Sequence, residues 1–224
     1  FPLCHKITVE LFYYISVYTD IKHSRILMMA AAAIVAGTAL VSCEKAPDLS
    51  GSWTCAPQHL NNVNGAFTAS TIDVLNFSNG TQGNKSGSIV ISSMISAQQT
   101  VSGTPDLIEP YQETVAATAS ISGSWSFRED NNDEVDVILD FSTLKVNVDP
   151  AGVAFSQNYI TGREQPQLDS LTASAVSRWQ QSLYEVLKPY YSKYVRLDDI
   201  EVKNGIMRTE VNDVDLTFTR EAKQ

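Results

Sequence analysis

The chain has 224 residues, with 16 basic and 25 acidic side chains and a net charge of −9 at pH 7. A surface this acidic repels nucleic acid and anionic lipid headgroups, so we predict no nucleic-acid partner and no membrane binding through a basic patch. The length is that of one domain, which buries a core without needing metals or disulfides.

An apolar run near the N-terminus divides the chain. It spans Ile26–Leu40, follows Lys22 and Arg25, and has 15 residues, whereas a bilayer span takes ~20. It therefore fits a secretory signal peptide better than a membrane span. The run leads into Leu40-Val41-Ser42-Cys43, which resembles the lipobox of bacterial lipoproteins. The alternative is an ordinary signal peptide with an A-x-A ending, which Ala39-Leu40-Val41 matches poorly.

This resemblance implies cleavage before Cys43 and acylation of its sulfur. We therefore predict that residues 1–42 are a leader, made of an upstream extension (1–20) and a signal peptide (about 21–42). Residues 43–48 are a predicted lipidated tether, and residues 49–224 a single β-rich domain. Glu44 is not the aspartate associated with inner-membrane retention, so we expect an outer-membrane lipoprotein on either the periplasmic or the surface face.

Period-two alternation predicts strands through the first half of this domain. The clearest strand is Thr114–Arg128, where apolar residues take the odd positions, hydroxyl-bearing residues take most even positions, and Gly123 is the expected bend. The other predicted strands are 49–54, 65–78 with a turn at 78–80, and 88–96 with Ile89, Ile91 and Ile95 on one face. Residues 81–87 and 105–110 are predicted loops.

The second half is predicted to combine a hairpin, one helix and two closing strands. An acidic turn at 129–134 leads into a strand over 135–148, with a bulge near Ser142 and Thr143. A loop over 151–167 follows, and a turn over 203–205 joins the last strands, 195–202 and 206–218.

The helix is predicted from apolar residues that recur every three or four positions from Leu168 to Tyr194. Asp169 or Ser170 is its expected N-cap, and Pro189 is expected to end or kink it. An isolated amphipathic helix is marginal in water, so this one must pack on the sheet.

Residues suited to catalysis or metal binding are scarce after the predicted cleavage. His59 is then the single histidine, and Cys55 is the single cysteine besides the acylated Cys43, which excludes a disulfide framework and a histidine-rich zinc site. A catalytic triad would need His59, which we interpret as a solvated loop residue. The run Asp130–Asp136 alternates oxygen ligands as calcium loops do, but it lacks the glycine of an EF-hand and is interpreted as a solvated turn. We predict no enzyme activity, no metal and no cofactor.

The outline resembles the lipocalin-like, or calycin-like, β-barrel lipoproteins of gut-type Gram-negative bacteria, most of which have no assigned activity. The residues that carry the resemblance are the opening Leu49, Gly51 and Trp53 and the closing Phe218 and Arg220. The resemblance implies an antiparallel barrel in which Arg220 packs across Trp53. The chain departs from the pattern because its helix precedes the last hairpin, and a second tryptophan, Trp125, leaves a two-sheet sandwich open.

We predict a lipid-anchored envelope module that binds a small apolar molecule or a glycan. The aromatic residues expected to line its ligand site are Trp125, Phe127, Trp179, Tyr190 and Tyr191. The alternative is a structural or assembly subunit of an envelope complex, docking through the hydroxyl-rich face of Thr114–Ser126 or through an exposed strand edge.

Overall fold

The computed structural model describes residues 46–60, 66–81, 83–102, 109–129 and 131–221. Contacts divide the chain into two compact units, 1–44 and 45–224, and all described residues belong to the second. The predicted leader, Cys43 and the start of the predicted tether lie outside the described residues.

The described residues form mainly strands. These are β1 (Gly51–Cys55), β2 (Gln58–Leu60), β3 (Thr68–Gly80), β4 (Gly83–Val101), β5 (Tyr111–Arg128), β6 (Asn131–Val148), β7 (Ala154–Phe155), β8 (Arg196–Lys203), β9 (Ile206–Val211) and β10 (Val214–Arg220). The helical segments are η1 (Pro150–Gly152), α3 (Gln157–Ile160), α4 (Gln165–Tyr191) and η2 (Ser192–Val195). Within these ranges, none of the helices has the length and apolarity needed to cross a bilayer.

The strands form one antiparallel sheet, and eight of them close into a barrel. Around the barrel the order is β1-β10-β9-β8-β6-β5-β4-β3, and β1 closes it by pairing with both β10 and β3. β2 pairs with β3, and β7 pairs with β5. The predicted antiparallel barrel with one long helix before the closing strands is confirmed, and the barrel rather than the two-sheet sandwich is formed.

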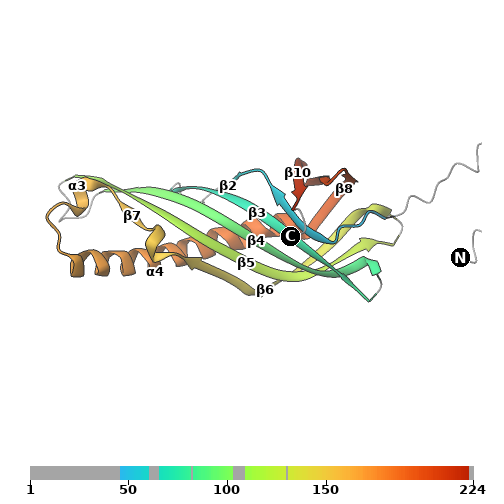
Figure 1. Cartoon of the computed structure of the whole chain (residues 1–224), viewed down its shortest axis with the longest axis horizontal. Coiled ribbons are helices and arrows are strands. Elements are labelled where there is room, and N and C mark those ends of the chain that lie inside the picture. Colours follow the sequence, from blue (N-terminus) through green and yellow to red (C-terminus); the bar gives the residue numbers. More distant parts are fainter. Residues whose placement is uncertain (1–45, 61–65, 82, 103–108, 130, 222–224) are drawn as a thin grey trace, which may run out of the picture. The chain divides into compact units, whose positions relative to one another are not determined.

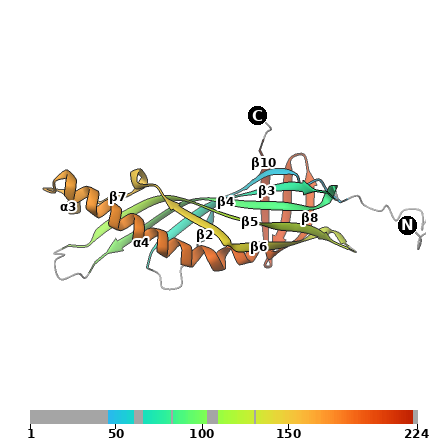
Figure 2. The same cartoon turned by 90° about the horizontal axis from the view of Figure 1, so that it is seen from below.

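The barrel is built from strands of very different length. β4 has 19 residues and β1 has five. β8 and β10 stand against one end of the long strands, whereas α4, drawn in orange, runs along the remainder of their length (Figures 1 and 2). The helix therefore covers the inner face of β3–β6 where the short strands do not reach.

The core follows the predicted alternation. In β5 the odd positions from Tyr111 to Ile121, and then Trp125 and Phe127, are buried, while the even positions are half-buried or exposed. On α4 the buried residues recur at every fourth position: Ala175, Trp179, Leu183, Leu187 and Tyr191. Strand and helix positions join one hydrophobic cluster, as the amphipathic pattern of the helix requires.

Gly123 and the predicted bulge lie together. A Cβ added at Gly123 would come 2.3 Å from the carbonyl oxygen of Ile138, so only glycine lets β6 approach so closely. The register between β5 and β6 shifts between Ser120 and Ser122. Across this shift, Oδ1 of Asp140 accepts hydrogen bonds from the backbone nitrogen and Oγ of Ser142, at 2.9 and 2.6 Å. The predicted bulge is confirmed.

The N-cap of α4 differs from the prediction. The helix begins at Gln165, and Glu164 is its N-cap in place of Asp169 or Ser170. The backbone nitrogen of Glu164 donates to Oε1 of Gln167 at 3.0 Å, and Pro166 is tolerated because the first turn needs no N–H donor there. Pro189 falls in the last turn, and the helix ends two residues later, at Tyr191, as predicted.

Three predicted boundaries were wrong. Residues 81–87 belong largely to β4, because a register shift at Asn79/Gly80 lets β3 and β4 pair beyond the predicted turn. Residues 151–167 are not one loop, because they include parts of η1, β7 and α3. The strand β7 forms because it pairs with β5. The predicted strand 206–218 is two strands, because Asn212 and Asp213 take φ angles of 50° and 60° and form a two-residue turn. The turn predicted over 203–205 is confirmed, with positive φ at Asn204 and Gly205.

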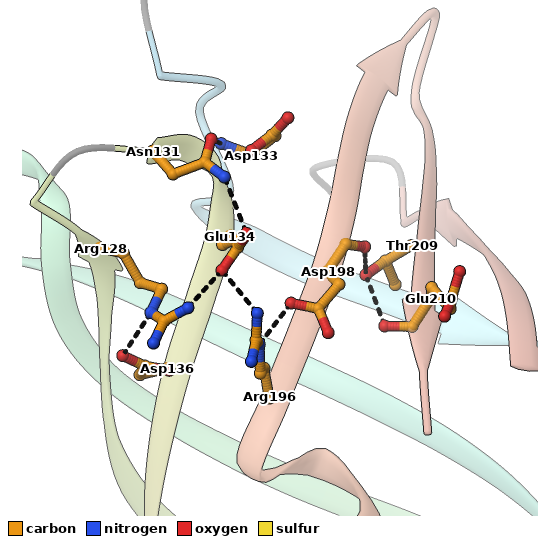
Figure 3. Close-up of polar contacts among 9 residues, drawn as sticks. All are labelled: Arg128, Asn131, Asp133, Glu134, Asp136, Arg196, Asp198, Thr209 and Glu210. Carbon is orange, nitrogen blue, oxygen red and sulfur yellow. Dashed lines mark hydrogen bonds and ion pairs between the residues drawn. The ribbon is translucent and has the colours of Figure 1, made fainter. Parts of the chain in front are cut away.

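Charged residues support the contact between β6 and β8, whose ladder consists of the pairs Val135↔Leu197 and Asp136↔Arg196. Oε2 of Glu134 accepts hydrogen bonds from Nη1 of Arg128 at 2.6 Å and from Nη2 of Arg196 at 2.7 Å (Figure 3). The Glu134 carboxylate therefore links Arg128, at the tip of the β5–β6 hairpin, to Arg196 on β8. Glu134 thus has a structural role.

The two ends of the domain meet at Trp53. The Arg220 guanidinium carbon lies 4.4 Å from the centroid of the Trp53 ring, and Nη2 of Arg220 donates to the carbonyl oxygen of Asp48 at 2.6 Å. The Trp53–Arg220 contact that the resemblance implied is thus present. Ala46 is buried and its carbonyl accepts a hydrogen bond from Asn84 at 3.2 Å. Residues 46–48 therefore pack on the barrel, so this part of the predicted tether belongs to the folded domain.

Candidate functional site

Buried polar residues gather inside the barrel at positions that alternation reserves for the core. Thr71 and Asp73 take inward positions of β3, and Ser93 takes an inward position of β4 between Ile91 and Ile95. All three are nearly inaccessible to solvent. A polar residue at such a position needs hydrogen-bond partners, so this interruption of the apolar pattern was the available sequence signal for the site.

Asp73 is the centre of this group. Its Oδ1 accepts hydrogen bonds from Thr71 Oγ1 at 2.9 Å and Ser93 Oγ at 2.6 Å. Its Oδ2 accepts from Tyr190 Oη at 2.5 Å and Tyr194 Oη at 2.6 Å. Four hydroxyl donors fill the acceptor capacity of an ionised carboxylate, so hydrogen bonds stabilise the buried group.

A third tyrosine, Tyr191, extends the group. Ser93 and Tyr191 share a hydrogen bond of 2.7 Å between their hydroxyl oxygens. Because Ser93 gives its single hydrogen to Asp73, Tyr191 is the donor. We call the set formed by Thr71, Asp73, Ser93, Tyr190, Tyr191, Lys193 and Tyr194 the Asp73 cluster.

Lys193 brings the opposite charge to the cluster. Its Nζ lies 3.9 Å from Oδ2 of Asp73, 3.9 Å from the centroid of the Tyr190 ring and 4.6 Å from that of Tyr194. The ammonium is thus held by one ion pair and two aromatic faces. Its side chain is 19% exposed. It makes no hydrogen bond to any residue in the described ranges.

Burial shifts the ionisation of the groups around Asp73. Desolvation lowers the pKa of Lys193, an effect that the Asp73 charge opposes. Desolvation is also the main cause that raises the pKa of Tyr190, Tyr191 and Tyr194, and it raises the pKa of the Cys55 thiol. The phenols and the thiol therefore stay protonated well above their ordinary range.

A pocket of about 460 Å³ opens beside the cluster. It lies where β2, the end of α4 and the β9–β10 hairpin meet, and we call it the Lys193 pocket. Its lining residues are Gln58, His59, Val186, Pro189, Tyr190, Lys193, Val211, Asn212, Val214 and Leu216. Its volume falls within the range of small-molecule sites, and its apolar walls with a few convergent polar groups are typical of them.

The structure separates the five aromatic residues predicted to bind a ligand. Trp125, Phe127, Trp179 and Tyr191 are buried in the core and line neither the Lys193 pocket nor the outer groove described below. Tyr190 lines the Lys193 pocket. Aromatic residues at strand or helix spacing favour the core because they bury the most apolar area there.

A second buried acid explains the position of Trp179. Oε1 of Glu113 accepts from Nε1 of Trp179 at 2.6 Å, and Oε2 accepts from Nη2 of Arg178 at 2.6 Å and from Gln99 at 3.2 Å. This group ties the first half of α4 to β4 and β5. Its neighbour Tyr111 stacks on Tyr159, and burial with that contact raises the pKa of Tyr111 to about 12. We interpret the Glu113 group as structural, because it holds helix to sheet.

The hydroxyl-rich outer face predicted for docking is hollowed at one end. A groove of about 410 Å³ crosses β3–β6 on this side. Its walls include Ile72, Met94, Ala116 and Thr118, and the Met94 side chain is 55% exposed. Ser124 and Ser126, further along the face, are exposed as the alternation predicts.

His59 lies in β2 rather than in a loop, with its side chain exposed at the edge of the Lys193 pocket. Among the described residues, no three His, Cys, Asp or Glu side chains are grouped as metal ligands. In the run considered for calcium, Glu134 and Asp136 face arginines (Figure 3).

Comparison of the chain with protein-family models, curated proteins and solved structures found no match.

Proposed function

We propose that the protein is a lipid-anchored module of the cell envelope that binds a small apolar molecule in the Lys193 pocket. The observation that carries the proposal is the pocket itself, whose lining combines Val186, Val211 and Leu216 with a half-buried lysine and a tyrosine of the Asp73 cluster. A concave apolar site beside residues with shifted pKa values is the typical setting of a binding site.

Anchoring is proposed from the sequence. Cys43 follows the lipobox, and two residues separate it from Ala46, which is packed on the barrel. A lipid on Cys43 would hold the domain close to the outer membrane. Mass spectrometry of the protein extracted from membranes of its host should find a diacylated or triacylated Cys43 as the first residue. An unmodified chain that retains residues before Cys43 would contradict the anchor and leave the pocket unaffected.

The test of binding uses a variant that narrows the pocket. Val214 lies in the lining and is 55% exposed, so tryptophan there should occupy the pocket with little effect on the core. We expect residues 45–224 to bind the neutral fluorophore N-phenyl-1-naphthylamine, and V214W to weaken binding about tenfold. Ile138 is 74% exposed and lines neither pocket, so I138W is the matched control and should bind normally. Equal binding by V214W and I138W, or none by the wild type, would contradict the proposal.

A glycan is the other ligand class for this pocket, with the half-buried Tyr190 and the polar side chains of Gln58, His59 and Asn212 as its contacts. Sugars place an apolar face on an aromatic ring and hydroxyls on amides. If the ligand is a glycan, the wild type should bind neutral oligosaccharides and should not bind the naphthylamine. V214W should then lose the oligosaccharide binding.

The outer groove favours a second candidate function, that of an assembly subunit. Met94 and Ile72 form an apolar patch on a face that is otherwise rich in hydroxyl groups, a composition that suits a protein contact. This function predicts a stoichiometric protein partner after extraction from membranes. M94E should release that partner, whereas V214W should retain it.

A further inference from the structure

We propose that the Lys193 pocket selects amphipathic acids, with the Lys193 ammonium pairing with the anionic group of the ligand. This inference rests on the proposed function, because it names the class of molecule that the same pocket binds. The ligand has an apolar body against the walls of the pocket and one carboxylate, sulfonate or similar group against Lys193.

The first step is that Asp73 accepts no hydrogen bond from Lys193. Thr71, Ser93, Tyr190 and Tyr194 already supply four hydrogen bonds to its two oxygens. The Lys193 ammonium stands 3.9 Å from Oδ2, beyond hydrogen-bond distance. Its ion pair with Asp73 is therefore an electrostatic contact that uses none of its three N–H donors.

The second step is that the side chain carrying these donors is largely enclosed. It is only 19% exposed, and its ammonium lies 3.9 Å from the Tyr190 ring centroid and 4.6 Å from that of Tyr194. A hydrogen bond from a charged donor is stronger in such a partly desolvated site than in bulk water, so an acceptor brought by a ligand gives a large gain. The open direction is the Lys193 pocket, which the residue lines.

The third step concerns charge. Among the described residues, the lining of the pocket includes no carboxylate, and Lys193 is its one lysine or arginine. The chain as a whole has a net charge of −9, so attraction of an anion must come from this local ammonium. The opposing walls are Val186, Val211 and Leu216, which suit an apolar body. A neutral apolar molecule would fill these walls and leave the lysine donors without an acceptor.

The test compares two fluorophores that differ by one anionic group. Anilinonaphthalene sulfonate is N-phenyl-1-naphthylamine with an added sulfonate. We expect residues 45–224 to bind the sulfonate about tenfold to a hundredfold more tightly, as a charge-assisted hydrogen bond would give. K193M should remove this preference and retain the naphthylamine, because methionine keeps the apolar stem. K193R should keep the preference. K188M is the control, because Lys188 is an exposed lysine in the last turn of α4, whereas Lys193 lies in η2.

Displacement extends the test to simple acids. Decanoate should displace the bound sulfonate at least tenfold more effectively than decanol does. Equal affinity for the two fluorophores, or a preference that survives K193M, would overturn the inference while the proposed function stands. Absence of binding by both would count against the proposed function itself. If K193M does not unfold cooperatively, K193R is the variant that tests the inference. Loss of the preference for the sulfonate by K193R, with naphthylamine binding retained, would then overturn the role of the Lys193 charge.

Discussion

Arg220 lies over Trp53, with its guanidinium carbon 4.4 Å from the ring centroid, and the two residues are register partners where β10 meets β1. The same guanidinium donates to the carbonyl oxygen of Asp48. One side chain therefore holds both the closing ladder of the barrel and the segment that enters it.

Replacing Arg220 with methionine should destabilise the domain by about 1–3 kcal/mol, because a cation–π contact and a hydrogen bond are lost. Lysine should restore part of the loss, since it has one charge centre and no planar fork. Urea denaturation measures the difference. R208M is the control, because Arg208 is exposed on β9, and it should change stability by no more than about 0.5 kcal/mol. If R220M lowers the free energy of unfolding no more than R208M does, Arg220 does not hold the ladder and the entering segment.

Asp73→Asn should be among the most destabilising conservative substitutions in the chain, at about 3–5 kcal/mol. The amide replaces one acceptor oxygen by a donor, which leaves two of the four hydroxyl donors facing an N–H group. It also removes the charge that faces Lys193. The measurement is the free energy of unfolding in urea, with the exposed Asp215→Asn as control. A cost below about 1 kcal/mol for D73N would show that Asp73 is not the centre of the cluster.

Glu113→Gln should cost about 2–4 kcal/mol, since it leaves Arg178 without its ion pair and one of the N–H donors, from Trp179 or Gln99, without an acceptor. The indole of Trp179 should move, so its near-UV circular dichroism should change with the stability. Glu185→Gln on the exposed face of α4 is the control. An unchanged indole signal would mean that packing rather than Glu113 positions Trp179.

Gly123→Ala should destabilise the barrel by about 1–3 kcal/mol, because its Cβ would come 2.3 Å from a backbone oxygen of β6 and the strand must shift. Ser124→Ala, one residue along on the exposed face, should change stability little. Hydrogen exchange should locate the effect in β5 and β6 around the bulge. Protection unchanged there in G123A would contradict the close approach.

Stability should fall as pH rises above about 10. The phenols of Tyr190, Tyr191 and Tyr194 have an ordinary pKa of 10.0 that burial raises in the folded protein. Above pH 10 the unfolded chain therefore binds fewer protons than the folded one, and the free energy of unfolding decreases with pH. Each such group contributes up to about 1.4 kcal/mol per pH unit in this window. Cys55 acts in the same direction from pH 9.0, and Lys193 acts against it because its pKa is lowered from 10.5.

Urea titrations between about pH 8 and 11 measure this slope. Tyr191→Phe should make it shallower, because one buried phenol is removed. Tyr184→Phe, on the same helix and outside the cluster, controls for the loss of a tyrosine hydroxyl as such. A stability that is flat or rising above pH 10 would contradict the proposed burial of the phenols.

Local pattern was sufficient for much of the fold. The long alternation of Thr114–Arg128, the bulge near Ser142, the Asn204–Gly205 turn and the helix periodicity were all predictable, because each depends on neighbours within a few residues. The N-cap at Glu164 was missed because neighbouring residues were equally good cap candidates. The turn at Asn212–Asp213 was missed because the residues around it also fit one continuous strand. β7 was missed because a two-residue strand exists only through its partner on β5.

The sequence alone thus determined the β-rich class, the single long helix and the expectation of an anchor at Cys43. Only the tertiary structure decided that the strands close into a barrel and that Asp73, Lys193 and three tyrosines meet inside it. Tyr190 and Asp73 are 117 residues apart in the chain. Contacts at that separation follow from how α4 packs on the long strands, and a pattern that repeats every two or four residues contains no information about them.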